Sequence, residues 1–349
     1  MNAPVYKNIA IIRLSSLGDI VHTIPAFNLL RKQFPQARIS WFAEPAGAKL
    51  LKNVAGIDEI IALNLKVKGF FKKLHEVNRI RSLYRKRFDL ILDFQGLLKS
   101  AVLARILKGT TIGFGKENLR EPQARVFYRH RVSPFSEDSH VIFKNLHLVR
   151  ELVNPANPPL IEYPLHPIPR SENLECFLSE HNLEKSRYII LNVGGAWESK
   201  LLETRQYIVI VHRLQERYPY PVVILWGNEK EEAVAREISR ETRALMTVFF
   251  DFSELILFIQ DSRLIVTADT LALHLADMVK IPSVGFFGPT SPWRNGSLLP
   301  ESTAVFEKLT CGFCYKKKCG KIDCIKKINI DSIVGAVGKI NEECHRDDY

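Results

Sequence analysis

The stretch RLSSLGDIVHTIPA, from Arg13 to Ala26, follows an apolar run over residues 7–14 that is typical of a buried parallel strand. It leads into a segment with apolar residues at helical spacing, from Ala26 to Phe34. In open α/β sheets, ligands bind beside the loops that follow the carboxyl ends of the strands. The stretch therefore predicts a parallel α/β sheet with a binding site at its edge.

One carboxylate, Asp19, lies at the centre of this stretch. Aspartate is favoured at helix N-caps, so one interpretation gives it a capping role. Pro25 argues against a helix that begins at Asp19, because a proline that far inside costs an amide hydrogen bond and kinks the helix. A helix that starts near Thr23, with Pro25 in its first turn, leaves Asp19 in the loop and free for chemistry. Both interpretations stay open on these residues alone.

The composition indicates two domains and an anionic partner. A chain of 349 residues with 46% apolar residues is long enough to bury more than one core. Its formal charge of +11 fits nucleic acid, an acidic membrane surface or a phosphorylated glycolipid, and charge alone does not choose among them. The sequence opens on no charged-then-apolar leader, and no apolar run approaches the roughly 20 residues that span a bilayer. We therefore expect a cytoplasmic enzyme.

Strand-like and helix-like segments alternate in both halves of the chain, which predicts two parallel sheets covered by helices. A basic amphipathic segment, residues 66–88, fits either a solvated helix over a core or a surface for a membrane or an anionic substrate. The proline-rich residues 161–170 predict a linker. We expect domains at residues 1–160 and 171–330, and a tail at residues 331–349 with a helix that packs back on the N-terminal domain.

The boundaries of the expected elements follow from the same patterns. The expected strands are Ile9–Leu14, Arg38–Ala43, Asp89–Phe94, Tyr188–Val193, Val222–Trp226, Leu264–Thr267 and Ser283–Phe287. The expected helical segments are Ala26–Phe34, Leu97–Leu107, Gln206–Tyr218, Lys230–Arg243 and Leu271–Val279, and a short element of unassigned type is expected near Ser253–Gln260.

The segment VTADTLALHLADM in the second half predicts an anion site. Asp269 and Thr270 follow a strand and precede a helix, whose unpaired amide groups and positive dipole end attract anions. His274, one turn inside the helix, is expected to face a cleft between the domains if Leu275 faces the sheet. The alternative is that Asp269 caps the helix and His274 is a half-buried helix residue.

Two other strand ends in this half favour a nucleotide site. NVGGAWESK offers Gly194 and Gly195, which allow close backbone approach to a phosphate, and Lys200, which can neutralise it. WGNEKEE offers an aromatic residue and acids, among them Glu232, for a nucleoside. Neither segment is specific alone, because Gly-Gly turns and solvated lysines are common.

Taken together, five segments resemble family 9 of the glycosyltransferases, the bacterial heptosyltransferases that build the lipopolysaccharide inner core. They are SSLGDIVHTIPA (15–26), FDLILDFQGLLKSAVLA (88–104), REPQARVFY (120–128), ADTLALHLA (268–276) and FGPTSPWRNG (287–296). The resemblance implies the GT-B architecture, in which two Rossmann-like domains face each other across a cleft. The N-terminal segments are most similar to the members that transfer the first heptose to Kdo on lipid A.

The resemblance implies a role for each matched residue. Asp19 is expected to be the catalytic base of a one-step inverting transfer. We expect the C-terminal domain to bind the nucleotide sugar through Gly194, Gly195, Lys200, Glu232, Asp269, Thr270 and His274. We expect the N-terminal domain to bind the acceptor through Ser15, Ser16, Gly18, Lys66, Lys68, Arg120 and Gln123. Arginine suits the Kdo carboxylate because its planar fork binds two oxygens.

The expected partners are an ADP-heptose donor, a Kdo–lipid A acceptor and the cytoplasmic face of an anionic inner membrane, to which a monomer binds peripherally. We expect no nucleic acid, cofactor or metal, since lysine and helix amides can stabilise the leaving diphosphate. Leu271, where the family has glycine, and the lack of the family's tryptophan after Lys200 leave another heptose or hexose donor open, including a second heptose addition. An RNA-binding protein would explain the charge but not the loop carboxylate or the nucleotide-type strand ends.

Four cysteines crowd into one short segment: Cys311, Cys314, Cys319 and Cys324. Their spacing differs from the paired knuckles of a strong zinc motif. We expect structural thiols, with a zinc or iron–sulfur site as the alternative.

Overall fold

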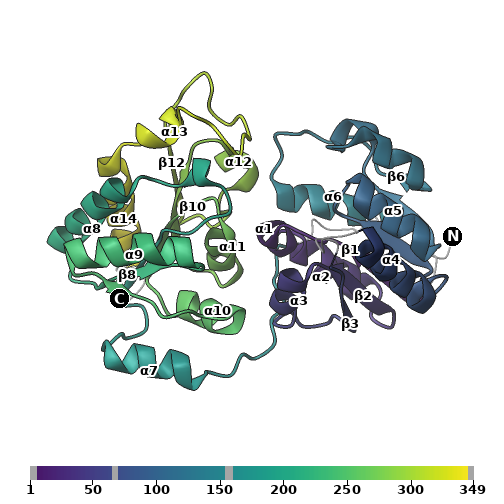
Figure 1. Cartoon of the computed structure of the whole chain (residues 1–349), viewed down its shortest axis with the longest axis horizontal. Helices are drawn as coiled ribbons and strands as arrows, with labels where there is room; N and C mark the ends of the chain where they lie inside the picture. The colour runs from purple at the N-terminus through teal and green to yellow at the C-terminus, as the bar shows by residue number, and fades with distance from the viewer. Residues whose placement is uncertain (1–5, 65–69, 154–159, 345–349) are drawn as a thin grey trace. The chain divides into compact units, whose positions relative to one another are not determined.

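The computed structural model describes residues 6–64, 70–153 and 160–344. The chain divides into two compact units, residues 1–167 and 168–349, each with its own sheet and helices (Figure 1). Each sheet has six strands, and all neighbouring strands are parallel. The predicted α/β class with two doubly wound sheets is therefore confirmed.

The N-terminal sheet has the strand order β3-β2-β1-β4-β5-β6, which is that of a doubly wound nucleotide-binding sheet. Its strands are β1 (Asn8–Ile12), β2 (Arg38–Ala43), β3 (Glu59–Ala62), β4 (Leu90–Asp93), β5 (Thr110–Gly113) and β6 (His130–Arg131). Its helices are α1 (Leu17–Val21), α2 (Ile24–Gln33), α3 (Pro45–Leu51), α4 (Phe70–Tyr84), α5 (Leu98–Leu107), η1 (Lys116–Asn118), η2 (Pro122–Phe127) and α6 (Val141–Val153). The central strands β1 and β4 are almost wholly buried, as expected for a sheet that is covered on both faces.

The basic amphipathic segment forms α4, which covers part of this sheet. Its Ile80 is buried and Tyr84 packs against the same apolar cluster as Phe42 and Phe88. Arg81 and Arg85 remain exposed. The described part of the segment is therefore a helix with one face on the core, while its outer face keeps its cations in solvent.

The C-terminal sheet has the order β12-β11-β10-β7-β8-β9, the same order as the first sheet when its strands are counted from β7. Its strands are β7 (Ile189–Asn192), β8 (Val222–Leu225), β9 (Leu245–Met246), β10 (Leu264–Ala268), β11 (Ser283–Phe287) and β12 (Thr303–Phe306). Its helices are α7 (Glu172–Glu180), η3 (Glu198–Lys200), α8 (Thr204–Arg217), α9 (Glu229–Thr242), α10 (Phe252–Gln260), α11 (Leu271–Met278), α12 (Pro292–Asn295), α13 (Asp323–Lys326) and α14 (Ile330–Cys344).

The C-terminal helix α14 corrects one expectation. We predicted that it packs on the N-terminal domain, but its apolar stripe of Ile333, Val337 and Ile340 is buried in the C-terminal core, with Val266 and Val284 of the sheet. The 3.6-residue spacing of this stripe matches a helix that lies on the sheet of its own unit. The prediction of a helix was right and its assigned partner was wrong.

Residues 160–170 contain no helix and no regular strand, and only Leu165 forms an isolated bridge, with Val54. The two units meet within the segment that we predicted as a linker. Among the described helices, none combines the length and apolar character that crossing a bilayer requires.

Candidate active site

Each sheet has one switch point, which is the pair of neighbouring strands whose following connections run to opposite sides of the sheet. In the N-terminal unit it lies between β1 and β4, and in the C-terminal unit between β7 and β10. Such points form crevices outside the carboxyl ends of the strands. The predicted residues 13–19 and 269–270 directly follow β1 and β10, and residues 192–195 begin at the last residue of β7, so topology places all three segments at the switch points of their own units.

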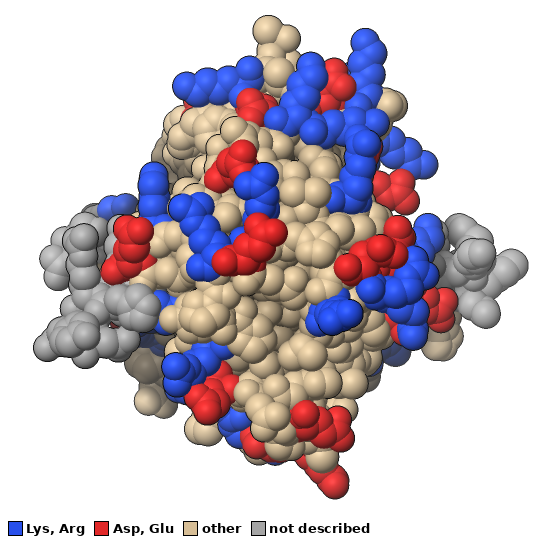
Figure 2. Space-filling view, turned by 90° about the vertical axis from the view of Figure 1, so that its left-hand side faces the viewer, with Lys and Arg blue, Asp and Glu red and all other residues tan. Residues whose placement is uncertain are grey.

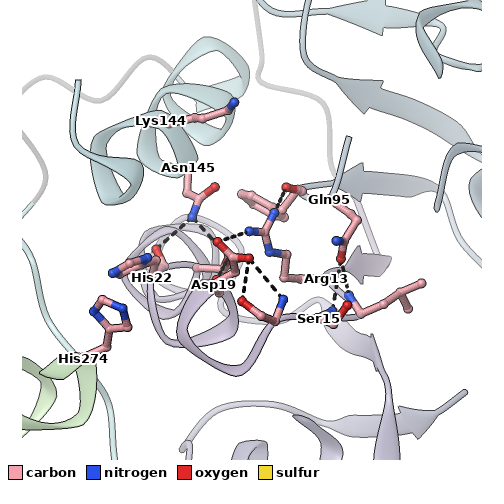
Figure 3. A network of polar contacts seen from close by, with 12 residues as sticks. Arg13, Ser15, Asp19, His22, Gln95, Lys144, Asn145 and His274 are labelled. Carbon is pink, nitrogen blue, oxygen red and sulfur yellow. Dashed lines mark hydrogen bonds and ion pairs between the residues drawn. The ribbon is translucent and has the colours of Figure 1, made fainter. Parts of the chain in front are cut away.

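Asp19 lies at the N-terminal switch point, on the five-residue helix α1 (Figure 3). Its Oδ2 accepts hydrogen bonds from the backbone N of Ser16, at 3.1 Å, and from Ser16 Oγ, at 2.9 Å. The main helix α2 begins at Ile24 with Pro25 in its first turn, as predicted. The expectation that Asp19 stays in a loop is wrong, because the preceding residues, Gly18 among them, coil into a separate short helix whose first turn its carboxylate stabilises.

Arg13 holds the other oxygen of this carboxylate. Its Nη2 lies 2.7 Å from Asp19 Oδ1, and its Nη1 donates to the carbonyl oxygen of Phe94 at the end of β4. The Arg13 side chain is 9% exposed and the Asp19 side chain 34% exposed. The carboxylate is thus fixed in orientation yet open to solvent. Sequence reasoning missed Arg13, because a single arginine after an apolar strand belongs to no motif.

A partly buried polar network supports the loop that carries Asp19. Gln95 Oε1 accepts hydrogen bonds from the backbone N of Leu14, at 2.9 Å, and of Ser15, at 3.1 Å. Asp93, which is wholly buried, accepts from the backbone N of Gln95 at 2.9 Å and from Tyr128 Oη at 2.7 Å. Burial raises the pKa of Asp93, and the hydrogen bond from Tyr128 opposes that rise only in part. Burial also raises the pKa of Tyr128.

A second anchor holds the carboxyl end of α1. Asn145 of α6 donates to the backbone oxygen of His22 at 2.9 Å and to Thr23 Oγ1 at 3.2 Å (Figure 3). Both interactions are buried. The short helix is therefore pinned at each end by an element that is distant in sequence.

The remaining acceptor residues lie farther along the chain. Arg120 and Gln123 are exposed, and Glu121 between them accepts a hydrogen bond from the backbone N of Leu98, at the start of α5, at 2.6 Å. Ser15, Ser16 and Gly18 adjoin Asp19, whereas the described contacts of Arg120 and Gln123 do not reach it. Two predicted residues, Lys66 and Lys68, lie outside the described residues.

In the C-terminal unit the structure brings Lys200, Asp269 and His274 together. Lys200 Nζ donates to Asp269 Oδ2 at 2.8 Å and to its backbone oxygen at 2.9 Å, and His274 Nε2 lies 3.2 Å from Asp269 Oδ1. Burial alone would raise the pKa of Asp269, but the hydrogen bond from His274 and the charge of Lys200 outweigh it and hold that pKa well below its usual range. The N-cap of α11 is Thr270, not Asp269. His274 is buried rather than half-buried.

The turns after β7 and β8 are joined by Glu231. Its Oε1 accepts from the backbone N of Gly195 at 3.0 Å, and its Oε2 accepts from that of Gly227 at 2.8 Å. A Cβ at Gly194 would lie 2.4 Å from Glu231 Oε2, so a side chain at this position would displace that carboxylate. The predicted Glu232 instead pairs with Arg236 on the surface of α9. The carboxylate that joins these two turns is therefore that of Glu231, while the binding role of Glu232 stays a prediction.

Asn192 connects the first of these turns to α11. Its Nδ2 donates to Thr270 Oγ1 at 3.1 Å and to Thr267 Oγ1 at 2.9 Å, and all three residues lie at the carboxyl edge of the sheet. The two predicted strand-end segments, residues 192–200 and 269–274, thus form one cluster.

The first three cysteines of the segment precede α13, Cys324 lies within this helix, and all four thiols are free. Cys311, Cys314 and Cys319 are exposed and Cys324 is buried. Lysine and arginine side chains gather at the top of the face seen in Figure 2, where Figure 1 places this loop and α13. Among the described residues, no group of three or more His, Cys, Asp or Glu side chains is arranged to hold a metal ion.

Comparison with known proteins identifies relatives over most of the chain. The family described as glycosyltransferase family 9 (heptosyltransferase) matches residues 77–324. Lipopolysaccharide heptosyltransferase 1 of Campylobacter coli is 30% identical over 296 residues, which are 82% of this chain and 85% of that protein. Lipopolysaccharide heptosyltransferase 1 of Pseudomonas aeruginosa is 24% identical over 89% of this chain and 87% of that protein.

Solved structures share the fold. The E. coli heptosyltransferase WaaC with ADP superposes with a TM-score of 0.76 at 19% identity and covers 96% of this chain and 99% of its own. A family 9 glycosyltransferase from Veillonella parvula superposes with a TM-score of 0.77 at 19% identity, covering 98% of this chain and 100% of its own. The family match, the relatives and the fold agree: the chain belongs to glycosyltransferase family 9 and is a heptosyltransferase with the GT-B fold.

Proposed function

We propose that the enzyme transfers a heptose from ADP-L-glycero-D-manno-heptose to Kdo of lipid A in lipopolysaccharide core biosynthesis. The N-terminal unit would bind the acceptor and the C-terminal unit the donor. The observation that carries the proposal is the Asp19 carboxylate, which is partly exposed yet held by Arg13 and Ser16 at a switch point. Two relatives named lipopolysaccharide heptosyltransferase 1 support the substrate class, and a solved neighbour with ADP supports the nucleotide.

In the proposed reaction Asp19 is the general base. Its carboxylate removes the proton of the acceptor hydroxyl while the hydroxyl oxygen forms a bond to the anomeric carbon of the heptose. The bond from that carbon to the diphosphate oxygen breaks on the opposite side, so the configuration inverts and ADP leaves. A carboxylate that is already oriented needs little rearrangement in the transition state, which is the advantage that Arg13 and Ser16 supply.

On the donor side, negative charge develops on the diphosphate as it leaves, so the site must place positive charge beside it. The backbone amides at the start of α11 suit this role, because the Thr270 side chain bonds to Asn192 and does not cap them. Lys200 adds its ammonium group beside them, balanced in this structure by Asp269. We infer that no metal is required for the transfer.

The donor sugar is the least constrained part of the proposal. Leu271 is the first residue of α11 and replaces the glycine expected in the family, so close backbone approach to the sugar changes there. A screen of ADP-heptose epimers and ADP-hexoses would identify the donor. If the enzyme prefers an acceptor that already carries one heptose, its reaction is the second heptose addition and not the first.

The test compares Asp19→Asn with wild type, using ADP-heptose and Kdo-bearing lipid A. We expect transfer, measured as ADP release and as the mass of the heptosylated product, to fall by about 10²–10⁴-fold, which is the usual contribution of a general base. ADP affinity, measured by calorimetry, should stay the same. Asp138→Asn, at an exposed carboxylate on a loop of the same unit, is the matched control. Wild-type turnover by Asp19→Asn would overturn the assignment.

The proposal includes a monomer bound peripherally to the cytoplasmic face of the inner membrane. A lipid-linked acceptor requires the active site to reach the headgroup region. Light scattering at the protein concentrations of the activity assay measures the molar mass and so tests whether the enzyme is a monomer.

A further inference from the structure

Apolar side chains are exposed on one surface of the N-terminal unit. Leu98 and Val102 of α5 are 40% and 42% exposed, and Val126 of η2, which packs against α5, is 70% exposed. On α5 the buried residues Ala101 and Ala104 face the core, so Leu98 and Val102, four residues apart, lie together on the outer face. Isolated exposed apolar residues are ordinary, but an adjoining group marks a binding surface.

Cations adjoin these apolar side chains. Arg105, Lys108 and Arg129 line a cavity of about 270 Å³ together with Val126. The backbone N of Lys86 donates to the backbone oxygen of Leu107 at 2.8 Å, which brings the basic end of α4 to the end of α5. We call Leu98, Val102, Val126, Arg105, Lys108 and Arg129 the α5–η2 surface.

The cations of this surface form no ion pair with any residue in the described ranges. Among the ion pairs of the described residues, none involves Arg105, Lys108 or Arg129. Repulsion from Arg85, followed by weaker effects of burial and of neighbouring cations that include Lys86, lowers the pKa of Lys108. Because these cations repel one another and lack ion-pair partners among the described residues, binding of an external anion to this surface is electrostatically favourable.

We propose that the α5–η2 surface docks on an anionic lipid bilayer. Exposed aliphatic side chains beside unpaired lysine and arginine fit the interface of a membrane, where apolar groups enter the headgroup boundary and cations meet lipid phosphates. A nucleic acid would use the cations but not the aliphatic side chains. The inference rests on the proposed function, which requires access to a lipid-linked acceptor.

The surface also adjoins the expected acceptor residues. Leu98 is hydrogen-bonded through its backbone N to Glu121, which lies between Arg120 and Gln123, and Val126 follows on the same short helix. A membrane bound to the α5–η2 surface would therefore bring lipid headgroups to this part of the unit.

Vesicle sedimentation tests the proposal with the full-length enzyme. Wild type should bind vesicles of equal parts phosphatidylglycerol and phosphatidylcholine, release them at high salt, and bind phosphatidylcholine alone weakly. Arg105→Gln/Lys108→Gln should bind the anionic vesicles roughly 25-fold more weakly, or about fivefold for each cation. Val102→Ser/Val126→Ser should lose roughly tenfold.

A matched control removes two cations elsewhere. Lys49→Gln/Lys52→Gln changes the net charge of the same unit equally, through exposed lysines at the end of α3, and should bind vesicles as wild type does. Equal losses in both charge variants, wild-type binding by Arg105→Gln/Lys108→Gln, or tighter binding to an RNA oligonucleotide than to anionic vesicles would each overturn the proposal. Melting temperatures close to that of wild type confirm that the variants fold.

An activity measurement separates the two proposals. Arg105→Gln/Lys108→Gln should transfer heptose to a soluble, deacylated Kdo saccharide at the wild-type rate, but more slowly to Kdo–lipid A in anionic vesicles. An absence of transfer by wild type to both acceptors counts against the proposed function alone, because sedimentation measures docking without turnover.

Discussion

Replacing Lys200 with methionine should destabilise the C-terminal unit, because it leaves a buried carboxylate without its cation. Lys200 Nζ makes hydrogen bonds to both the Oδ2 and the backbone oxygen of Asp269. The side chains of the pair are 14% and 4% exposed. Methionine keeps most of the length and apolar packing of the lysine stem and removes only the charge and its donors.

The expected size of the effect follows from this burial. Removing one partner of a buried ion pair costs about 3–5 kcal/mol. We expect the lower end, about 3 kcal/mol, because water reaches part of Lys200 and the ring of His274 still faces Asp269. At roughly 2–4 °C for each kcal/mol, the C-terminal unit should melt roughly 6–12 °C lower.

The effect should depend on pH in a defined direction. The pKa of Asp269 is held below its usual range in the folded state. Its contribution to stability is therefore fully present above the unfolded pKa of about 3.9 and is lost as pH falls through the lower folded value. The difference in unfolding free energy between wild type and Lys200→Met should stay constant from about pH 8 to pH 5 and shrink below about pH 4.

Tryptophan fluorescence during urea and thermal unfolding measures this effect, since Trp197, Trp226 and Trp293 belong to the C-terminal unit. Lys185→Met, at an exposed lysine of the same unit, is the control. The double variant Lys200→Met/Asp269→Asn should recover much of the loss, because no unpaired charge remains. A melting temperature of Lys200→Met equal to that of Lys185→Met, or a double variant no more stable than the single one, would refute the reasoning.

Three further predictions concern the groups that shape the two switch points. Gly194→Ala should weaken ADP binding roughly tenfold in calorimetry, because its Cβ displaces the Glu231 carboxylate that joins two turns; unchanged affinity would contradict this. Tyr128→Phe should cost about 1–3 kcal/mol in urea unfolding. Its effect should grow as pH rises through the raised pKa of Asp93, because the Tyr128 hydroxyl stabilises the ionised carboxylate more than the neutral acid; a loss that grows toward low pH would exclude this account. Arg13→Met should slow heptose transfer by about 10²-fold at unchanged ADP affinity, because the proposed base loses its orientation, and full activity would show that this ion pair does not matter.

Much of the fold follows from the sequence, because parallel strands buried on both faces are short continuous apolar runs. The bounds predicted for Arg38–Ala43 and Ser283–Phe287 coincide with β2 and β11. The short helix α1 was missed since five residues carry no helical period. The partner of α14 was also missed, because an apolar stripe indicates that a helix packs on a core and not which core.

The sequence indicated which segments form the site, but it was less reliable for the individual residues within them. The motifs led to both switch points because chain order alone places the ends of the central strands there. We predicted Glu232 as a binding residue, whereas the carboxylate that joins the two turns is that of Glu231; one residue along a helix turns the side chain by about 100°. Arg13 was missed because a single arginine after an apolar strand belongs to no motif, although its partner Asp19 is only six positions away. Asp93 was missed because its partner Tyr128 is 35 positions away, which no local pattern reveals.

Because α14 packs within the unit that it follows in the chain, each half of the enzyme is one uninterrupted stretch of sequence. Each sheet is also complete within its own unit. A single junction within residues 160–167 would therefore suffice to build chimaeras that exchange whole C-terminal halves between family members while all β-pairing is kept. If the two halves bind donor and acceptor as we propose, the same arrangement lets recombination change the donor sugar while the acceptor half is kept.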